Sequence, residues 1–129
     1  MDVQSLTDDA DEVLDGVTLS QLASGDRGSV QHFRIEPGAL VDVHSHEHEQ
    51  IGWVSTGELV FTVGEEEYIV GPDTSYAIPG DTPHSAENRG DVDVVGIEVF
   101  SPPRPSLRRW SPSSSGRSSP PGPSDRRGS

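Results

Sequence analysis

Three histidines and one glutamine occupy two short segments at a spacing that suits a metal ion. His44 and His46 lie two residues apart, and Gln50 follows four residues later. His84 stands in a separate segment, IPGDTPH. Residues two apart on a strand point to the same side, so a strand here would turn the first two histidines towards one interior. Three imidazoles and one amide can close around one divalent transition metal ion, such as manganese, iron, nickel or zinc. The spacing therefore predicts a mononuclear site that joins two parts of the fold.

Two neighbouring side chains offer alternative donors. His48 shares the parity of the first two histidines and could compete as a ligand. Glu49 would supply an oxygen in place of Gln50 if the strand register shifted by one residue. The segment could also be a solvated polar turn on an acidic protein, but that interpretation does not predict His84 in a second segment. We favour metal binding through His44, His46, His84 and Gln50.

The glutamine has a consequence for the charge of such a site. A carboxylate ligand would cancel one charge of a divalent ion, whereas the neutral amide of Gln50 leaves both. The metal then polarises a bound carbonyl or hydroxyl more strongly and acidifies bound water. Four protein ligands leave one or two positions open on a five- or six-coordinate ion, whereas a closed tetrahedral zinc would be structural. The ligand set favours Lewis-acid chemistry on an oxygen-rich small molecule.

Length and composition limit the class of protein. The 129 residues leave room for one domain. A hydrophobic content of 30% suffices for a β-barrel, because only alternate residues have to face inward. The absence of cysteine excludes disulfides and thiolate metal sites. No apolar stretch approaches transmembrane length, and the N-terminus is acidic where a signal peptide would be basic. We therefore expect a cytoplasmic protein that does not associate with a membrane.

Charge divides the chain into two parts. Residues 1–103 contain 21 Asp or Glu, three Arg and no Lys, a balance of −18. Such a surface is typical of a salt-adapted, halophilic protein, and it makes nucleic-acid binding by the folded part unfavourable. From residue 104 onward six Arg and one Asp give +5 in a segment rich in Ser, Pro and Gly. We expect a flexible acidic segment at 1–16, a barrel at 17–104 and a disordered tail at 105–129.

Alternating apolar residues predict an almost entirely β chain. The expected strands are short and separated by turns rich in Gly, Pro, Asp and Ser; they cover residues 17–23, 30–35, 40–46, 51–55, 58–63, 67–70, 75–78 and 92–100. Thr56 and Gly57 form a predicted tight hairpin turn. Strands at this spacing indicate a barrel or a sandwich.

The last predicted strand carries further candidates for chemistry. Alternation places Glu98 and Phe100 on one face. If that face is the interior, burial favours the protonated form of Glu98, which suits proton transfer. Arg104 could pair with the carboxylate of a substrate. Alternatively, Glu98 faces outward among many surface acids and Arg104 begins the basic tail. Trp53, Phe61 and Tyr76 could also line a cavity, although strand alternation does not show which side each faces.

The residues around the histidines resemble the cupin superfamily. Its first motif falls on a glycine, two histidines, a third ligand and a glycine, here Gly38, His44, His46, Gln50 and Gly57, with Gln where most members have Glu. Its second motif falls on Pro79, Asp81, His84 and Asn88, with Asp in place of a glycine. The resemblance covers about residues 30–100. It implies a small antiparallel cupin barrel, the jelly-roll or double-stranded β-helix fold, with one metal held by His44, His46, Gln50 and His84. It also implies that His48 lies in the turn, either behind the metal ligands or at the rim of the barrel.

The end of the barrel resembles a narrower group, the cupins of pectin and alginate degradation that convert unsaturated uronates to linear ketonised sugars. Their acid-x-Phe-Ser-Pro-x-Arg ending implies catalytic roles for Glu98 and Phe100 and a substrate contact for Arg104. The sequence departs from them in having Glu where they have Asp. We expect a metal-dependent enzyme that acts on a small carboxylated metabolite, with uronate linearisation as the specific hypothesis. The alternatives are a metal-dependent dioxygenase and a non-catalytic ligand-binding or sensing module. The family resemblance also predicts a homodimer.

Overall fold

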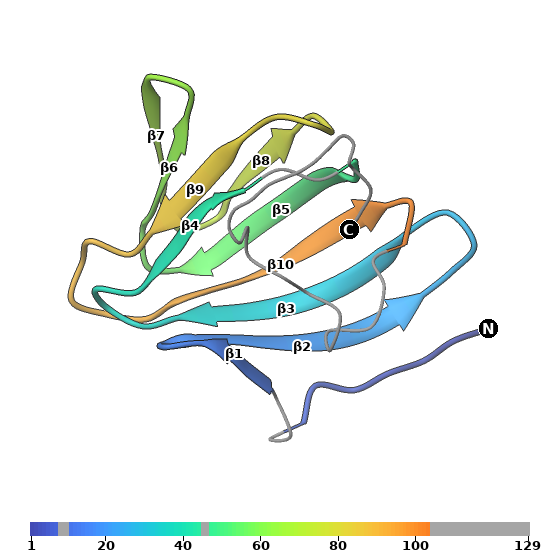
Figure 1. The fold of residues 1–129 in the computed structure, drawn as a ribbon. Coiled ribbons are helices and arrows are strands. Elements are labelled where there is room, and N and C mark those ends of the chain that lie inside the picture. The colour runs from blue at the N-terminus through green and yellow to red at the C-terminus, as the bar shows by residue number, and fades with distance from the viewer. Residues whose placement is uncertain (8–10, 45–46, 104–129) are drawn as a thin grey trace.

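The computed structural model describes residues 1–7, 11–44 and 47–103, and every regular element in these ranges is a β-strand (Figure 1). The strands are β1 (Asp11–Leu14), β2 (Val17–Ser24), β3 (Ser29–Ile35), β4 (Leu40–His44), β5 (Glu49–Thr56), β6 (Leu59–Val63), β7 (Glu66–Val70), β8 (Thr74–Ile78), β9 (His84–Glu87) and β10 (Val94–Ser101). All their pairings are antiparallel, which confirms the predicted fold class. Within the described ranges, we find no helix with the length and hydrophobicity of a membrane span.

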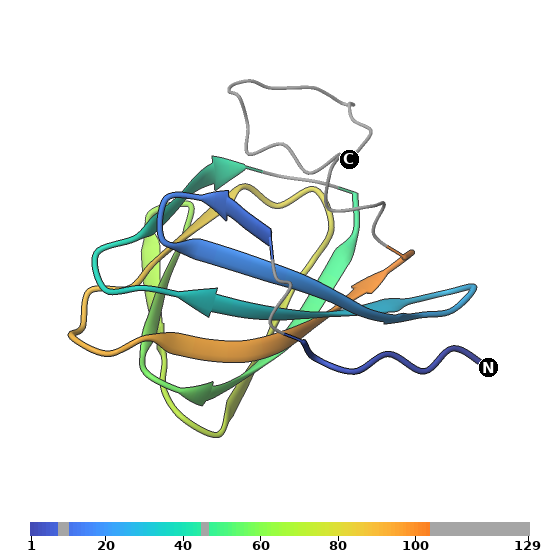
Figure 2. The same ribbon diagram turned by 90° about the horizontal axis from the view of Figure 1, so that it is seen from below.

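Two sheets enclose a common core. The larger has the order β1-β2-β3-β10-β5-β8 and the smaller the order β4-β9-β6-β7. β10 lies between β3 and β5, far from both in sequence, as Figure 1 shows. Figure 2 shows the sheets wrapped around the interior as a barrel. The core takes residues from both sheets, such as Val17 and Phe33 from the larger and Leu59 and Phe61 from the smaller.

Alternation along β5 and β10 determines which side chains reach the interior. Exposed and buried residues alternate from Glu49 to Val54 in β5 and from Gly96 to Ser101 in β10. Gln50, Glu98 and Phe100 therefore face inward, because a pleated strand turns successive side chains to opposite faces. Of the two alternatives drawn from the sequence, an inward-facing Glu98 is therefore the one that the structure shows, rather than an outward-facing one among surface acids.

Two strands were not expected from the sequence. β1 lies in the segment 1–16 and pairs with the start of β2. β9 begins at His84 and lies between β4 and β6 in the smaller sheet. Its sequence, HSAE, has little intrinsic preference for a strand, so pairing with both neighbours stabilises it instead. The proposed division into segments at 16 and 104 stays a prediction, because the tail at 105–129 lies outside the described residues.

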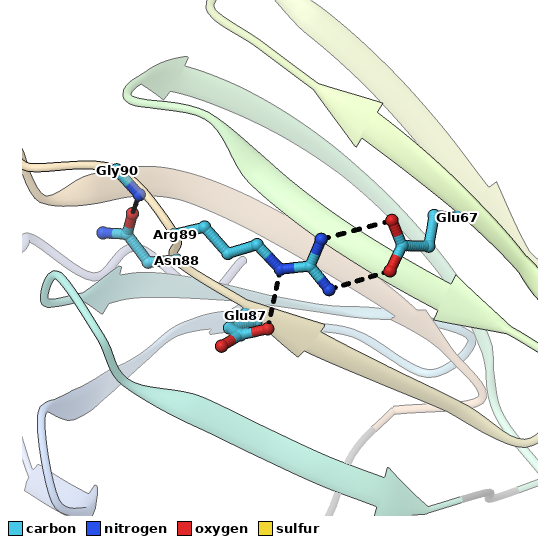
Figure 3. Close-up of polar contacts among 5 residues, drawn as sticks. All are labelled: Glu67, Glu87, Asn88, Arg89 and Gly90. Carbon is cyan, nitrogen blue, oxygen red and sulfur yellow. Dashed lines mark hydrogen bonds and ion pairs between the residues drawn. The ribbon is translucent and has the colours of Figure 1, made fainter.

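Asn88, the last residue of the second motif, is a structural residue. Its side chain is fully buried, and its amide nitrogen donates to the carbonyl oxygens of Ile35 at 2.9 Å and Val92 at 2.8 Å. Its side-chain oxygen accepts the backbone N–H of Gly90 at 2.9 Å (Figure 3). These bonds fix the turn between β9 and β10 against the end of β3.

Arg89 follows in the same turn and connects β7 to the end of β9. Its guanidinium donates to both carboxylate oxygens of Glu67, at 3.2 and 2.8 Å, and to Glu87 at 2.8 Å (Figure 3). The pairing lowers the pKa of Glu67 below its ordinary value. All three side chains are solvent-exposed, so the pairs contribute little to stability and are screened by salt.

Asp81 occupies the position of a glycine in the second motif, and its backbone explains why glycine suits that position. Its φ angle is 61°, in the left-handed region that most L residues avoid. Asp tolerates this region better than most residues, because its short side chain can bond to the local backbone. The exchange therefore preserves the turn that leads into β9 and His84.

Candidate functional site

A cavity of about 50 Å³ lies between the two sheets. A cavity needs roughly 10–15 Å³ to hold one water molecule, so this one has room for a metal ion and a few ligand atoms. Most of its wall is apolar. Its polar lining residues are all buried and come from both sheets: Gln31, Gln50, His84 and Glu98.

Glu98 is the centre of a buried hydrogen-bond network. The side-chain amide of Gln31 donates to Oε1 of Glu98 at 3.3 Å. The amide of Gln50 and the hydroxyl of Tyr76 both donate to Oε2. Only 9% of Glu98 is exposed, so these three donors replace much of the water that a surface carboxylate would bind.

The strand register explains how Tyr76 reaches Glu98 across an intervening strand. Gln31, Glu98, Gly52 and Tyr76 are successive partners across β3, β10, β5 and β8. A Cβ atom on Gly52 would lie 2.3 Å from Cζ and 2.4 Å from the hydroxyl oxygen of Tyr76. The tyrosine side chain therefore passes over the glycine to bond Glu98, and only glycine leaves room for it.

Tyr76 is held as a hydrogen-bond donor. Burial raises its pKa well above the ordinary value of a phenol, and the negative charge of Glu98 and the bond to it raise it further. Its ring also packs on Phe61, with ring centroids 4.6 Å apart. The hydroxyl thus keeps its proton at neutral pH and directs it to Glu98.

The donor atoms of Gln50 and His84 fit a metal ion. Because the amide nitrogen of Gln50 donates to Glu98, its Oε1 is left buried without a hydrogen-bond partner among the described residues. Nδ1 of His84 contacts the carbonyl oxygen of Thr82 at 2.8 Å, and a carbonyl can only accept, so Nδ1 carries the proton. The buried Nε2 of His84 then carries the lone pair that a metal needs.

The other two predicted ligands are placed only in part. His44 is the last residue of β4, and its Cα is paired with that of His84 across β4 and β9. His46 lies outside the described residues, as does Arg104. Among the described residues, His, Cys, Asp and Glu side chains form no group of three or more that could hold a metal ion. The ligand set of His44, His46, Gln50 and His84 therefore stays a prediction.

The remaining candidates lie close to this site. Phe100 is fully buried and is the register partner of Gln50. The ring of His48 is buried and meets Phe100 edge-on, with centroids 6.1 Å apart. Glu49 is exposed, so the observed register turns Gln50 rather than Glu49 towards the cavity.

The aromatic candidates differ in position, and one site residue was not foreseen. Phe61 lines the cavity and Tyr76 bonds Glu98, whereas Trp53 is exposed on the outer face. Sequence reasoning missed Gln31. Its position could have been noticed, because it shares the inward parity of Phe33 on an alternating strand.

Comparison with known proteins identifies the family. The sequence pattern described as Cupin domain matches residues 31–100, more than half of the chain. This chain therefore belongs to the cupin family, which confirms the resemblance drawn from its two motifs.

Solved structures agree with this assignment. The structure of KdgF from Halomonas sp. superposes with a TM-score of 0.71 and 27% identity, over 77% of this chain and 90% of that one. An RmlC-like cupin from Shewanella frigidimarina gives a TM-score of 0.70 at 22% identity, over 77% and 87% of the two chains, which shows the shared fold alone. The likeness supports the resemblance to pectin-degradation cupins and confirms the jelly-roll fold.

Curated relatives match only in part. The H2HPP isomerase of Bacillus subtilis is 35% identical over 66 residues, which is 50% of this chain and 28% of the relative. The mannose-1-phosphate guanylyltransferase of Salmonella muenchen is 31% identical over 83 residues, 64% of this chain and 18% of the relative. The chain thus spans less than a third of either protein.

Proposed function

We propose that this cupin is a metal-dependent enzyme for a small, oxygen-rich, carboxylated metabolite, and specifically that it linearises an unsaturated uronate. The metal would be one divalent transition ion held by His44, His46, Gln50 and His84. One observation carries the proposal: the buried carboxylate of Glu98 accepts the amide nitrogen of Gln50, whose buried oxygen is left for a metal, in a cavity shared with His84. An acid next to a metal position is the arrangement that proton transfer at a polarised oxygen requires.

Each residue of the candidate site has a definite part in this proposal. A bound metal would act as a Lewis acid on a substrate hydroxyl or carbonyl oxygen. Glu98 would take a proton from the substrate hydroxyl and return one to carbon as the ring opens to the linear ketone. Gln31 and Tyr76 hold the Glu98 carboxylate in place by donating to it. Phe100 excludes water behind Glu98, and Arg104 would pair with the substrate carboxylate.

Two comparisons support this class of reaction. The ending that carries Glu98, Phe100 and Arg104 resembles that of the uronate-linearising cupins, and KdgF shares the fold. The relative from Bacillus subtilis is named an isomerase, and the proposed reaction is also a rearrangement without loss of atoms.

A direct test measures metal content and turnover together. Protein purified in high salt without metal-affinity chromatography should contain about one equivalent of a transition metal. Added to an unsaturated uronate, it should lower the ultraviolet absorbance of the conjugated double bond of that substrate. His84→Ala should lose both the metal and the activity. Metal-loaded protein that leaves the uronate unchanged would refute the specific reaction, and iron as the bound metal would direct the next assay to oxygen consumption.

We also propose that two copies of the chain associate through the outer face of the larger sheet. Ile51 and Trp53 of β5 lie opposite Val99 and Ile97 of β10, and between 37% and 46% of each is exposed. Residues 1–103 carry a balance of −18, which would repel a second copy. The patch formed by these four apolar side chains is where a second copy can approach with the least repulsion.

A further inference from the structure

One hydrogen bond couples Gln50 to Glu98, and chemistry fixes its direction. The amide nitrogen of Gln50 donates to Oε2 of Glu98. Oε2 of Glu98 also accepts the hydroxyl of Tyr76, so this oxygen acts as an acceptor and the group of Gln50 that faces it is the NH₂. The amide oxygen then turns away from Glu98, and it is this oxygen that is buried without a hydrogen-bond partner among the described residues.

Two further contacts of this carboxylate follow the same rule. The groups that face it from β3 and β8 are the amide of Gln31 and the hydroxyl of Tyr76, and both donate. Donors from three strands thus surround one acceptor. Position 50 differs from Gln31 and Tyr76 in that its amide oxygen is buried without a hydrogen-bond partner among the described residues.

A glutamate at position 50 would break this arrangement. Gln50 is 6% exposed and Glu98 is 9% exposed, so two carboxyl groups would face each other away from water. Two buried carboxylates in contact repel strongly unless they share a proton, and neither outcome reproduces the amide donor that Glu98 has now. A glutamate at position 50 is therefore disfavoured beside an acid at position 98.

We propose that Glu98 determines the residue type at position 50: the acid requires an amide, whose NH₂ group holds Glu98 while its oxygen is left for the metal. Glu98 is thus a positioning residue for Gln50 in addition to its proposed part in proton transfer. The role of the oxygen rests on the proposed function. The coupling between the two side chains needs no metal.

The test is a reciprocal exchange measured in chelator. Four proteins are compared by thermal denaturation: the wild type, Gln50→Glu, Glu98→Gln, and the double variant with both changes. Gln50→Glu should lower the Tm by about 10 °C or more, in line with a buried uncompensated charge. The double variant should recover most of that loss, because its amide at position 98 can donate to the carboxylate at position 50. If Gln50→Glu does not fold at all, a double variant that folds supports the coupling in the same way as a recovered Tm.

Controls separate the coupling from charge and from the proposed function. Gln21→Glu adds the same charge at an exposed position of β2 and should leave the Tm nearly unchanged. Purely additive effects of the two exchanges, or a Gln50→Glu variant as stable as the wild type, would overturn the inference. With manganese or zinc added, the double variant should bind one equivalent but show no uronate turnover, since it lacks the acid at 98. A wild type that binds no metal would refute the proposed function, while the Tm values in chelator would still decide the coupling.

Discussion

Gly52→Ala should displace Tyr76 and thereby disrupt the hydrogen-bond network of Glu98. The new methyl group would lie 2.3–2.7 Å from three atoms of the tyrosine, well inside contact distance. Because the ring is packed on Phe61, the side chain has to leave its place. The loss includes a hydrogen bond to a carboxylate, about 1.5–3 kcal/mol, and it is offset by roughly 0.5–1 kcal/mol because alanine is favoured over glycine in a strand.

The expected net destabilisation is about 1.5 kcal/mol, which corresponds to a fall in Tm of about 5 °C for a domain of this size. Circular dichroism during heating in chelator measures it without any contribution from a metal. Gly71→Ala is the matched control, because its methyl group would meet only one carboxylate oxygen of Glu58, 4.0 Å away. It should leave the Tm within a few degrees of wild type.

A double-mutant cycle isolates the mechanism. In a Tyr76→Ala background the space above Gly52 is free, so Gly52→Ala should be neutral or slightly stabilising there. An equal loss of stability in both backgrounds would refute the steric reasoning, since the methyl group would then be acting on something other than the tyrosine.

Four further predictions concern other parts of the molecule. Asn88→Ala removes the three hydrogen bonds of a buried side chain and should destabilise the protein by about 3 kcal/mol in urea denaturation, whereas a change below 1 kcal/mol would show that water replaces the amide. Burial, together with the nearby Arg34, lowers the pKa of His32 from 6.5, so below pH 6.5 the unfolded chain binds more protons and stability falls as the pH drops towards the folded pKa. His32→Gln should flatten the Tm profile in that window, and an unchanged profile would contradict the assignment. Trp53→Glu should convert a dimer to a monomer in sedimentation, and Ile69→Glu on β7 should not; equal effects would exclude the proposed face. The Tm should rise from about 0.1 M to about 1 M NaCl, because salt screens the balance of −18 in residues 1–103, and a flat response would argue against salt adaptation.

Local patterns in the sequence were enough for the fold class and for most strands. Alternation predicted eight of the ten strands found in the described ranges, and glycine-rich turns separated them, because both features depend on residues close in sequence. β9 was missed because its four residues are stabilised by β4 and β6 on either side of it. The two motifs identified the cupin family, since each is a short pattern of residues that can be recognised in the sequence without knowledge of the fold.

The candidate site was predicted in part. The sequence singled out Gln50, His84, Glu98 and Phe100, and the structure turns all four towards the interior. Their roles stay predictions, as do those of His46 and Arg104, which lie outside the described residues.

The sequence by itself determined which side chains could bind a metal or transfer a proton, and which of them lie on the same face of a strand. Parity says that Glu98 and Phe100 share a face, but not whether that face is inside. Only the tertiary structure decided this, by placing β10 between β3 and β5 in the larger sheet. The same pairing aligns Gln31, Glu98, Gly52 and Tyr76, which are up to 67 residues apart in the chain. A contact between strands so distant depends on how the whole sheet is ordered, and no local pattern of side chains encodes that order.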